Sequence, residues 1–272
     1  MFFSNWRRRA LMTLMLRGIT GLAFLVPLMW MASASLHRLG VPLPTSLHIL
    51  PEQPTLENFS RLWESVPLGR YTFNSLLVVI LGVPLTLLTA SWAGLGMARL
   101  PRASQRRWVI LSLAVLMVPG IAVWSTRFLV YRTLGWYDTI WALIAPAWMG
   151  TSPFFVLMFY RAFRRIPSAI YDSAILDGAG VLQLWAHVTL PMARTTVLGV
   201  AILSFVFYWG DFVSPLLYLN SESLYTLPVA LRLLEQLTRA DWGLLMAAAS
   251  WTTAIPVLLF LLAQPYFARI GE

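Results

Sequence analysis

Long apolar stretches alternate with shorter polar stretches along the whole chain. A helix of about 20 apolar residues crosses the roughly 30 Å hydrocarbon core of a bilayer, and six stretches here approach or exceed that length. The pattern therefore predicts an all-α membrane protein with six transmembrane helices. The predicted spans cover, approximately, residues 18–36, 71–95, 108–130, 139–160, 195–219 and 243–265.

The arginine clusters indicate how these spans are oriented. Dense clusters at residues 7–9, 99–107 and 161–165 all fall on the side that carries both termini. Because cytoplasmic loops are enriched in basic residues, this bias predicts that both termini are cytoplasmic. The segment 37–70 is then external, and the loop 161–194 is cytoplasmic.

The N-terminal segment also has the order of a secretory signal peptide, with basic residues, an apolar run and the small residues Ala32-Ser33-Ala34. The apolar run is long for a signal peptide, and Arg17 interrupts it. We therefore expect the first span to be retained, with cleavage as the alternative. The external segment ends in an amphipathic pattern with Phe59, Leu62 and Trp63 on one face. This stripe lies on the membrane surface or contacts an external partner.

Composition supports a membrane protein and excludes several other classes. Hydrophobic residues make up 58% of the chain and charged residues 11%, against about 25% charged in a soluble domain. The net charge of +9 does not indicate nucleic-acid binding, because the arginines form short clusters beside apolar spans, where membrane orientation explains them. The absence of cysteine excludes disulfides, and the three histidines are scattered without a metal-ligand spacing.

Known catalytic motifs are also absent from the sequence. The chain contains no GxxxxGK[ST], HExxH or GxSxG motif and no paired carboxylates within one loop. We therefore expect no catalytic site, and the energy for any transport must come from an ion gradient or a partner. Asp211 falls inside the predicted span 195–219. A charge at a helix centre costs on the order of 2.5–3.5 kcal/mol, so Asp211 is expected to face a polar cavity or a partner.

The loop 161–194 contains a glycine-hinged insert, YDSAILDGAGVLQLWAHVTLP. Pro167 suits the first position of a short helix, and Gly178 suits a left-handed residue that ends it. A second short helix follows, and Pro191 is expected to break away from it. The apolar residues of this helix–turn–helix either pack under its own spans or dock on a partner. These residues are Ile175, Leu176, Leu182, Leu184 and Trp185.

The insert resembles the EAA loop of ABC importer permeases, whose pattern is Glu-Ala-Ala, three residues, Gly, nine residues, Ile, one residue and Leu-Pro. Here Asp172-Ser173-Ala174, Gly178, Val188 and Leu190-Pro191 stand at the same spacing. The stretches PTLENFSRLW, RYTFNSLLV, YWGDFVSPLLYLNSESLYTLPVAL and ADWGLLMAAASWTTAIPVLLFLLAQPYF resemble permeases of the carbohydrate-uptake branch, especially the smaller maltose-system type of subunit. The likeness covers residues 54–267, approximately.

This resemblance implies a type I ABC importer permease fold, with one transmembrane domain over residues 1–272 and a cytoplasmic coupling helix. It implies ATP-driven uptake of a sugar or sugar-like solute across the inner membrane of a bacterium or archaeon. The implied partners are a second homologous permease, two ABC ATPase subunits, an extracytoplasmic solute-binding protein and membrane lipid. ATP and Mg are used by the ATPase subunits, and this chain is expected to bind no cofactor of its own.

The resemblance also implies roles for individual residues. The implied ATPase-coupling residues are Asp172, Ser173, Ala174, Asp177, Gly178, Ala179, Leu190 and Pro191, and Asp211 is the candidate for the translocation path. Two of these depart from the family pattern, since Asp172 replaces Glu and Ser173 replaces Ala. The alternatives are an ABC permease for another small solute, an ion-coupled secondary carrier and a membrane scaffold.

Overall fold

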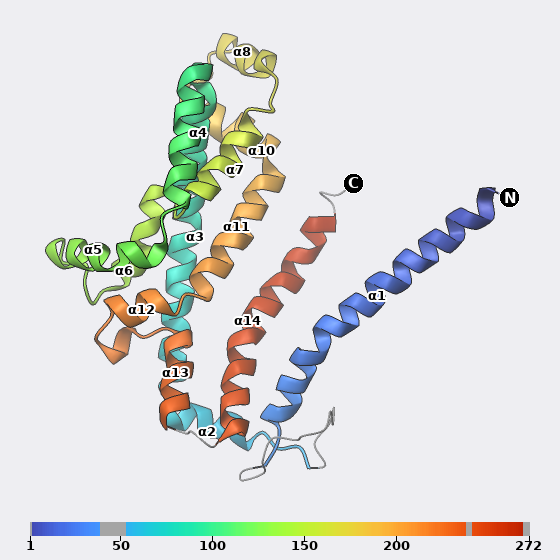
Figure 1. Cartoon of the computed structure of the whole chain (residues 1–272), viewed down its shortest axis with the longest axis vertical. Coiled ribbons are helices and arrows are strands. Elements are labelled where there is room, and N and C mark those ends of the chain that lie inside the picture. The colour runs from blue at the N-terminus through green and yellow to red at the C-terminus, as the bar shows by residue number, and fades with distance from the viewer. Residues whose placement is uncertain (1, 39–52, 238–240, 269–272) are drawn as a thin grey trace. The chain divides into compact units, whose positions relative to one another are not determined.

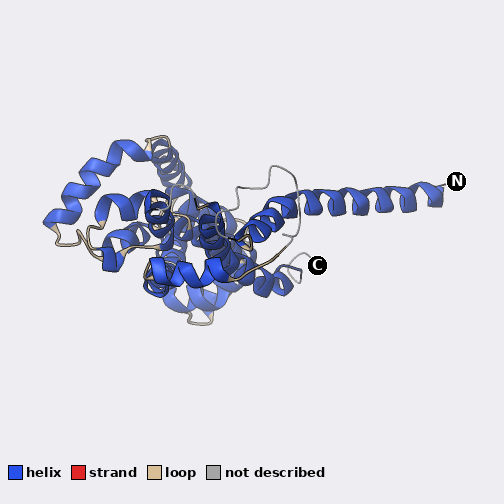
Figure 2. Cartoon of the chain, turned by 90° about the horizontal axis from the view of Figure 1, so that it is seen from below, coloured by secondary structure: helices blue, strands red, loops and turns tan. Residues whose placement is uncertain are grey.

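The computed structural model describes residues 2–38, 53–237 and 241–268, and every regular element in these ranges is helical (Figure 2). The α-helices are α1 (Phe2–Ser35), α2 (Glu57–Ser65), α3 (Leu68–Arg99), α4 (Arg102–Leu116), α5 (Gly120–Thr133), α6 (Ile140–Ile144), α7 (Pro153–Phe163), α8 (Ser168–Leu176), α9 (Val181–Gln183), α10 (Leu190–Met192), α11 (Arg194–Trp209), α12 (Val213–Tyr218), α13 (Leu227–Leu237) and α14 (Trp242–Ala268). Two 3₁₀ turns cover Ala145–Met149 and Glu222–Leu224, and a π-helical stretch covers Leu184–Thr189.

Four stretches of the described chain are long and apolar enough to cross a membrane. They are Gly18–Ser35, Leu68–Arg99, Ile140–Phe163 and Trp242–Gln264. Two bent pairs would raise the number to six if each pair forms one span. These pairs are Arg102–Leu116 with Gly120–Thr133, bent by 93°, and Val181–Met192 with Arg194–Trp209, bent by 86°. The all-helical membrane fold is thus confirmed, and the number of six spans stays a prediction.

The predicted span 108–130 is not one straight helix in the structure. α4 ends at Leu116 and α5 begins at Gly120, with a sharp bend between them. Pro119 lies in this bend in an extended conformation. Proline lacks the N–H that an α-helix requires, and its ring collides with the preceding turn. The apolar composition of the segment therefore does not reveal that a helix ends within it.

The predicted spans 139–160 and 195–219 are also interrupted. In the first, Gly150 and Thr151 both adopt positive φ angles, of 72° and 61°, between the 3₁₀ turn and α7. In the second, α11 ends at Trp209 and α12 begins only at Val213. Apolar length predicted where these segments lie but not where their helices stop.

The chain divides into two compact units, residues 1–69 with 230–272 and residues 70–229. In the first unit, α14 packs against α1 and α2. The stripe predicted on α2 contributes to this packing, because Leu62 is fully buried and the Trp63 ring meets Trp251 edge-on, with centroids 5.5 Å apart. Leu62 is therefore internal to this unit, whereas Phe59 is half-buried and Trp63 stays exposed.

A polar network also joins the helices of the first unit. The Asn58 side-chain amide is buried and donates to the carbonyls of Ser35 at 2.9 Å and His37 at 2.7 Å. The Arg61 guanidinium lies 2.6 Å from the Asp241 carboxylate. These bonds connect the end of α1, the middle of α2 and the residue before α14.

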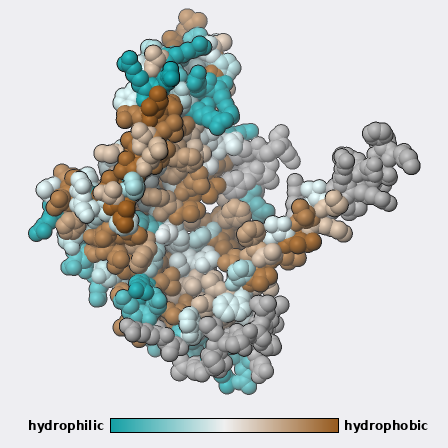
Figure 3. Space-filling model, viewed as in Figure 1, coloured by the Kyte–Doolittle hydropathy of each residue, from teal (hydrophilic) through white to brown (hydrophobic). Residues whose placement is uncertain are grey.

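In the second unit, α7 packs against both α4 and α11. Figure 1 shows α8 at one end of these helices, while α5, α6 and α12 gather away from it. Apolar side chains cover the middle of this unit, and hydrophilic side chains gather at the end where α8 lies (Figure 3). This distribution is typical of a protein whose middle lies in lipid and whose end enters water.

A glycine sets the closest approach of α3 to α7. A Cβ atom on Gly94 would lie 2.6 Å from the Phe159 Cβ and 2.8 Å from the Tyr160 backbone nitrogen. Both distances are far below van der Waals contact, and both neighbours belong to or adjoin the backbone of α7. Only glycine fits here without separating the helices.

We expect Gly94→Ala to lower the free energy of unfolding by about 1–3 kcal/mol, because the added methyl group overpacks this contact. Gly96→Ala is the matched control on the same helix, since nothing lies within 4 Å of a Cβ at Gly96. Alanine there should be neutral or slightly stabilising, because it favours helix over glycine. Thermal unfolding in detergent, followed by tryptophan fluorescence, measures both. Equal melting temperatures for the two variants would contradict the assignment of Gly94.

Candidate functional site

A left-handed glycine ends α8 inside the 161–194 loop. Gly178 has a φ of 84°, as its sequence context predicted. Its N–H donates to the Ile175 carbonyl at 3.0 Å, and the N–H of Ala179 donates to the Ala174 carbonyl at 2.9 Å. These two bonds form a Schellman cap, which closes a helix end and reverses the chain.

Both proline predictions in this loop are wrong in detail. Pro167 is not the first helical residue but the one before it, with φ −56° and ψ 138°. Pro191 does not break the second helix, because α10 continues through it to Met192. The helix instead ends at Ala193, with φ −103° and ψ 22°, where the chain bends into α11.

The π-helical stretch explains why Pro191 is tolerated. The N–H of Leu190 donates to the carbonyl of Trp185, five residues back rather than four. This wider turn comes immediately before Pro191, which has no N–H to donate. The irregular hydrogen bonding therefore coincides with the proline, and the chain stays helical. Turns of this kind are frequent at functional sites.

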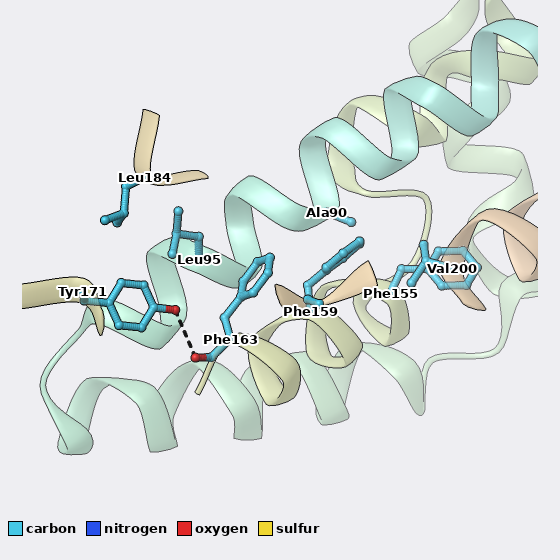
Figure 4. Packing of buried hydrophobic residues seen from close by; sticks show 9 residues of the cluster. Ala90, Leu95, Phe155, Phe159, Phe163, Tyr171, Leu184 and Val200 are labelled. Carbon is cyan, nitrogen blue, oxygen red and sulfur yellow. Dashed lines mark hydrogen bonds between the residues drawn. The ribbon is translucent and has the colours of Figure 1, made fainter. Parts of the chain in front are cut away.

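A buried apolar cluster fixes the loop to α3 and α7 (Figure 4). Its members are Ala90, Leu95, Phe155, Phe159, Phe163, Tyr171, Leu184, Ala193 and Val200. The Tyr171 hydroxyl donates to the Phe163 carbonyl at 3.1 Å. The Trp185 indole N–H donates to the Ser91 hydroxyl at 2.9 Å. Tyr171 in the first helix of the loop and Trp185 in the second are thus each held by packing of the ring and by a hydrogen bond.

The surroundings of Tyr171 keep its hydroxyl protonated. Burial raises the pKa of Tyr171 above its ordinary value, and the nearby charge of Arg99 only partly offsets this. The Arg99 guanidinium lies over the ring, 4.7 Å from its centroid. At neutral pH the phenol is therefore a hydrogen-bond donor, and a cation–π contact ties it to the last residue of α3.

The other side of the loop leaves apolar side chains in solvent. Four of them form what we term the apolar tip: Ile175 (50% exposed), Leu176 (87%), Val181 (73%) and Leu182 (60%). Leu184 and Trp185 face inward instead, toward the buried cluster. The apolar surface predicted for this loop is therefore divided between internal packing and an exposed tip.

The predicted coupling residues divide in the same way. Six of them contact solvent or form the turn, and two pack inward. Asp172, Ser173, Asp177, Gly178 and Pro191 are exposed and Ala179 is half-buried, whereas Ala174 and Leu190 pack against the buried cluster. Within residues 2–38, 53–237 and 241–268, neither Asp172 nor Asp177 forms an ion pair.

Asp211 lies at a helix break rather than at a helix centre. It follows α11 and is half-buried. Its carboxylate accepts a hydrogen bond from the backbone N–H of Ser214, 3.0 Å away. This is the bond by which an acidic side chain caps the start of a helix, here α12. This hydrogen bond therefore offsets part of the free-energy cost of placing a carboxylate among apolar spans.

Sequence reasoning missed a buried hydroxyl cluster at the interruption before α7. The Thr151 hydroxyl lies 2.7 Å from the Tyr208 hydroxyl, and the Thr86 hydroxyl bonds to both. Thr89 donates to the Ala147 carbonyl inside the 3₁₀ turn. Irregular backbone within a membrane needs such partners, because lipid supplies none. The signal that could have found this site is Gly150-Thr151-Ser152 within an apolar run.

A second missed contact joins two loops of the second unit. The Asp138 carboxylate accepts the backbone N–H groups of Asn220 and Ser221, each at 2.8 Å, and the Ser221 hydroxyl. Burial acts to raise the pKa of Asp138, but the bonds from Ser221 and Asn220 outweigh it and lower the pKa below its ordinary value. Asp138 is therefore ionised at neutral pH, and it adopts a left-handed φ of 58°, which aspartate tolerates better than most residues.

Comparison with protein families gives one match over most of the chain. Residues 82–270 match the family described as "Binding-protein-dependent transport system inner membrane component". This range contains the entire 161–194 loop and Asp211. Because the matched range exceeds half of the chain, membership does not rest on the loop alone.

Several curated proteins are similar over more than four fifths of their length. The chain is 32% identical over 231 residues to the inner membrane ABC transporter permease protein YcjP of Escherichia coli, covering 83% of this chain and 82% of that protein. It is 29% identical to the diacetylchitobiose uptake system permease protein NgcG of Streptomyces coelicolor, with coverages of 94% and 85%. It is 27% identical to the trehalose/maltose transport system permease protein MalG of Thermococcus litoralis, with coverages of 89% and 87%.

A solved structure has the same fold. A chain from a bacterial ABC transporter involved in the import of alginate superposes with a TM-score of 0.76 at 18% identity, covering 96% of this chain and 97% of that one. At this level of identity the likeness concerns the fold. A chain from a bacterial alginate ABC transporter in complex with an alginate pentasaccharide-bound periplasmic protein superposes with a TM-score of 0.69 at 16% identity, covering 98% of this chain and 96% of that one.

We expect Gly178→Val to loosen the turn of the 161–194 loop, because a β-branched residue at positive φ costs about 1–3 kcal/mol. Amide hydrogen exchange over residues 174–183 should accelerate by about tenfold or more. Gly178→Asn is the control, since asparagine tolerates this conformation and nothing lies within 4 Å of a Cβ at Gly178. Equal exchange in both variants would show that the left-handed conformation does not stabilise the turn.

Proposed function

This chain belongs to the family of binding-protein-dependent transport system inner membrane components, and we propose that it is the permease subunit of an ATP-driven importer for a sugar or sugar-like solute. As a member of this family it is a multi-pass transport component of the inner membrane. The ATP-binding subunits, the second permease and the solute-binding protein are the partners that this proposal adds.

The similar proteins favour a saccharide as the solute. Diacetylchitobiose, trehalose and maltose appear in the names of two relatives, and alginate is the solute of the transporter with the same fold. The 161–194 loop carries no information on the solute, because its proposed partner is the motor and not the cargo. A permease for another small solute is therefore the alternative within the same class.

The apolar tip is the observation that carries the assignment of a motor partner. Leu176 and Val181 are 87% and 73% exposed, although they flank a turn that is held rigidly. Exposed apolar side chains grouped on a rigid, polar-flanked turn indicate a docking surface. We infer that an ATPase subunit covers the tip, and that its movement on ATP binding displaces the loop.

The contacts that anchor the loop would transmit that movement to the helices α3 and α7. Tyr171 and Trp185 join the loop to α7 and α3 by hydrogen bonds and ring packing. A displaced loop therefore carries these helices with it instead of bending on its own. Two conformations of the ATPase would thereby select two conformations of the spans, which is alternating access driven by a partner.

Each predicted coupling residue has a proposed role that follows from its position. Asp172 and Asp177 are free to accept hydrogen bonds from basic side chains or backbone amides of the ATPase. Ser173 is small and leaves room for its surface. Gly178 with Ala174 and Ala179 forms the turn, since Ala174 accepts the hydrogen bond from Ala179. Two further residues set the direction of the second helix: Leu190 packs inward, and Pro191 follows directly after the π turn.

Purification of the tagged chain from its native membrane in mild detergent tests this function directly. We expect mass spectrometry to find a P-loop ATPase and a second permease in stable ratio with the chain. The double variant Leu176→Glu, Val181→Glu should lower ATPase recovery by about tenfold or more, because charges replace a buried apolar contact. Recovery of the second permease should not change.

Leu100→Gln is the matched control, because Leu100 is also exposed but lies outside the loop, between α3 and α4. It should leave ATPase recovery unchanged. A chain recovered alone in several detergents would contradict the proposal. So would uptake that persists without ATP and collapses with the ion gradient, which is the behaviour of a secondary carrier.

The charge of Asp211 is proposed to line the translocation path, and two substitutions separate this role from capping. Asp211→Asn keeps an oxygen that can accept the Ser214 N–H but removes the charge. We expect it to lower solute uptake by about tenfold or more while assembly is unchanged. Asp211→Leu removes both and should also impair assembly. Normal uptake by Asp211→Asn would show that the residue serves only as a cap.

A further inference from the structure

A pocket of about 630 Å³ lies where the 161–194 loop joins the helices of the second unit. Both ends of the loop border it. Ile166 and Pro167 precede α8, and Met192 and Ala193 lead into α11. A molecule in this pocket would therefore touch the loop at the two points where it meets the spans.

The polar part of the pocket has an uncompensated positive charge. Arg161 and Arg165 line it, and no carboxylate does. Within the described residues, neither arginine forms an ion pair. Arg161 lies in the last turn of α7 and Arg165 lies in the turn that follows the helix, so two like charges border one pocket and repel each other. A bound anion would remove this repulsion, and the hydroxyls of Thr195 and Thr196 are further donors for it.

Much of the remaining lining is apolar. Met158 and Ala162 belong to α7, inside the candidate span Ile140–Phe163, and Met192 also lines the pocket. The pocket thus follows the last turns of α7 from apolar to basic surface. That order matches the boundary of a bilayer, where acyl chains give way to headgroups.

We propose that this pocket binds an anionic phospholipid. The phosphate lies between Arg161 and Arg165, and the first part of an acyl chain lies along Met158 and Met192. An acidic side chain of a soluble partner would satisfy the arginines but would leave the apolar floor uncovered. The bound lipid would brace both ends of the loop. Any effect of this bracing on transport rests on the proposed function, whereas the binding of the lipid itself does not.

Native mass spectrometry of the purified full chain in neutral detergent tests the site. The probes are dioleoyl phosphatidylglycerol, dioleoyl phosphatidylcholine and inorganic phosphate. We expect phosphatidylglycerol to be retained in preference to phosphatidylcholine, and phosphate not to displace it. The double variant Arg161→Gln, Arg165→Gln should bind phosphatidylglycerol about tenfold more weakly.

Two further variants distinguish binding in the pocket from attraction by diffuse charge and from loss of folding. The double variant Arg106→Gln, Arg107→Gln removes the same charge from exposed positions of α4 outside the pocket, and should bind as the unchanged chain does. Arg161→Lys, Arg165→Lys keeps the charge and should bind within a few-fold, which shows that loss of binding is not loss of folding.

Three results would overturn the proposal. Equal weakening by the α4 variant would mean that diffuse positive charge, and not the pocket, attracts the lipid. Displacement by inorganic phosphate would identify a site for soluble anions. No preference for phosphatidylglycerol over phosphatidylcholine in the unchanged chain would remove the site altogether.

Discussion

The second unit depends on the close packing of α7 against α3. Because Gly94 has no side chain, Phe159 reaches the backbone of α3 and is fully buried. Phe159 stacks on Phe163, and the same cluster continues to Tyr171 in the 161–194 loop. A single line of aromatic contacts therefore runs from the middle of the spans to the loop. The contact between Gly94 and Phe159 thus holds in place the aromatic residues that follow it, Phe163 and Tyr171.

Apolar length in the sequence was sufficient for the long helices. α1, α3 and α14 appear where a stretch of apolar residues predicted a span, although each extends further than predicted. The interruptions were missed because an average over apolar residues does not register a helix end. At Pro119 the backbone lacks a donor, and at Gly150 it turns to positive φ. Both residues were visible, but membrane helices tolerate such residues often enough that neither is decisive alone.

The candidate site was predictable to the extent that it depends on local backbone chemistry. Gly178 could be placed in a left-handed conformation because the helix before it had to end. The role of Pro191 could not be predicted, because the π turn before it depends on packing of Leu184 and Trp185 against distant helices. For the same reason, the sequence did not reveal which apolar residues of the loop face inward. That division follows from tertiary contacts with residues about 90 positions away, such as Ser91.

The bend at Ala193 gives the loop a mechanical property. The helical stretch Val181–Met192 meets α11 at 86°, so the two behave as the arms of an elbow. A force along one arm has almost no component along the other, and it must therefore appear as torque at the joint. A thrust on the end of the loop is thus converted into a tilt of α11 and not into sliding along its axis. For the alternating access proposed above, tilting is the useful motion.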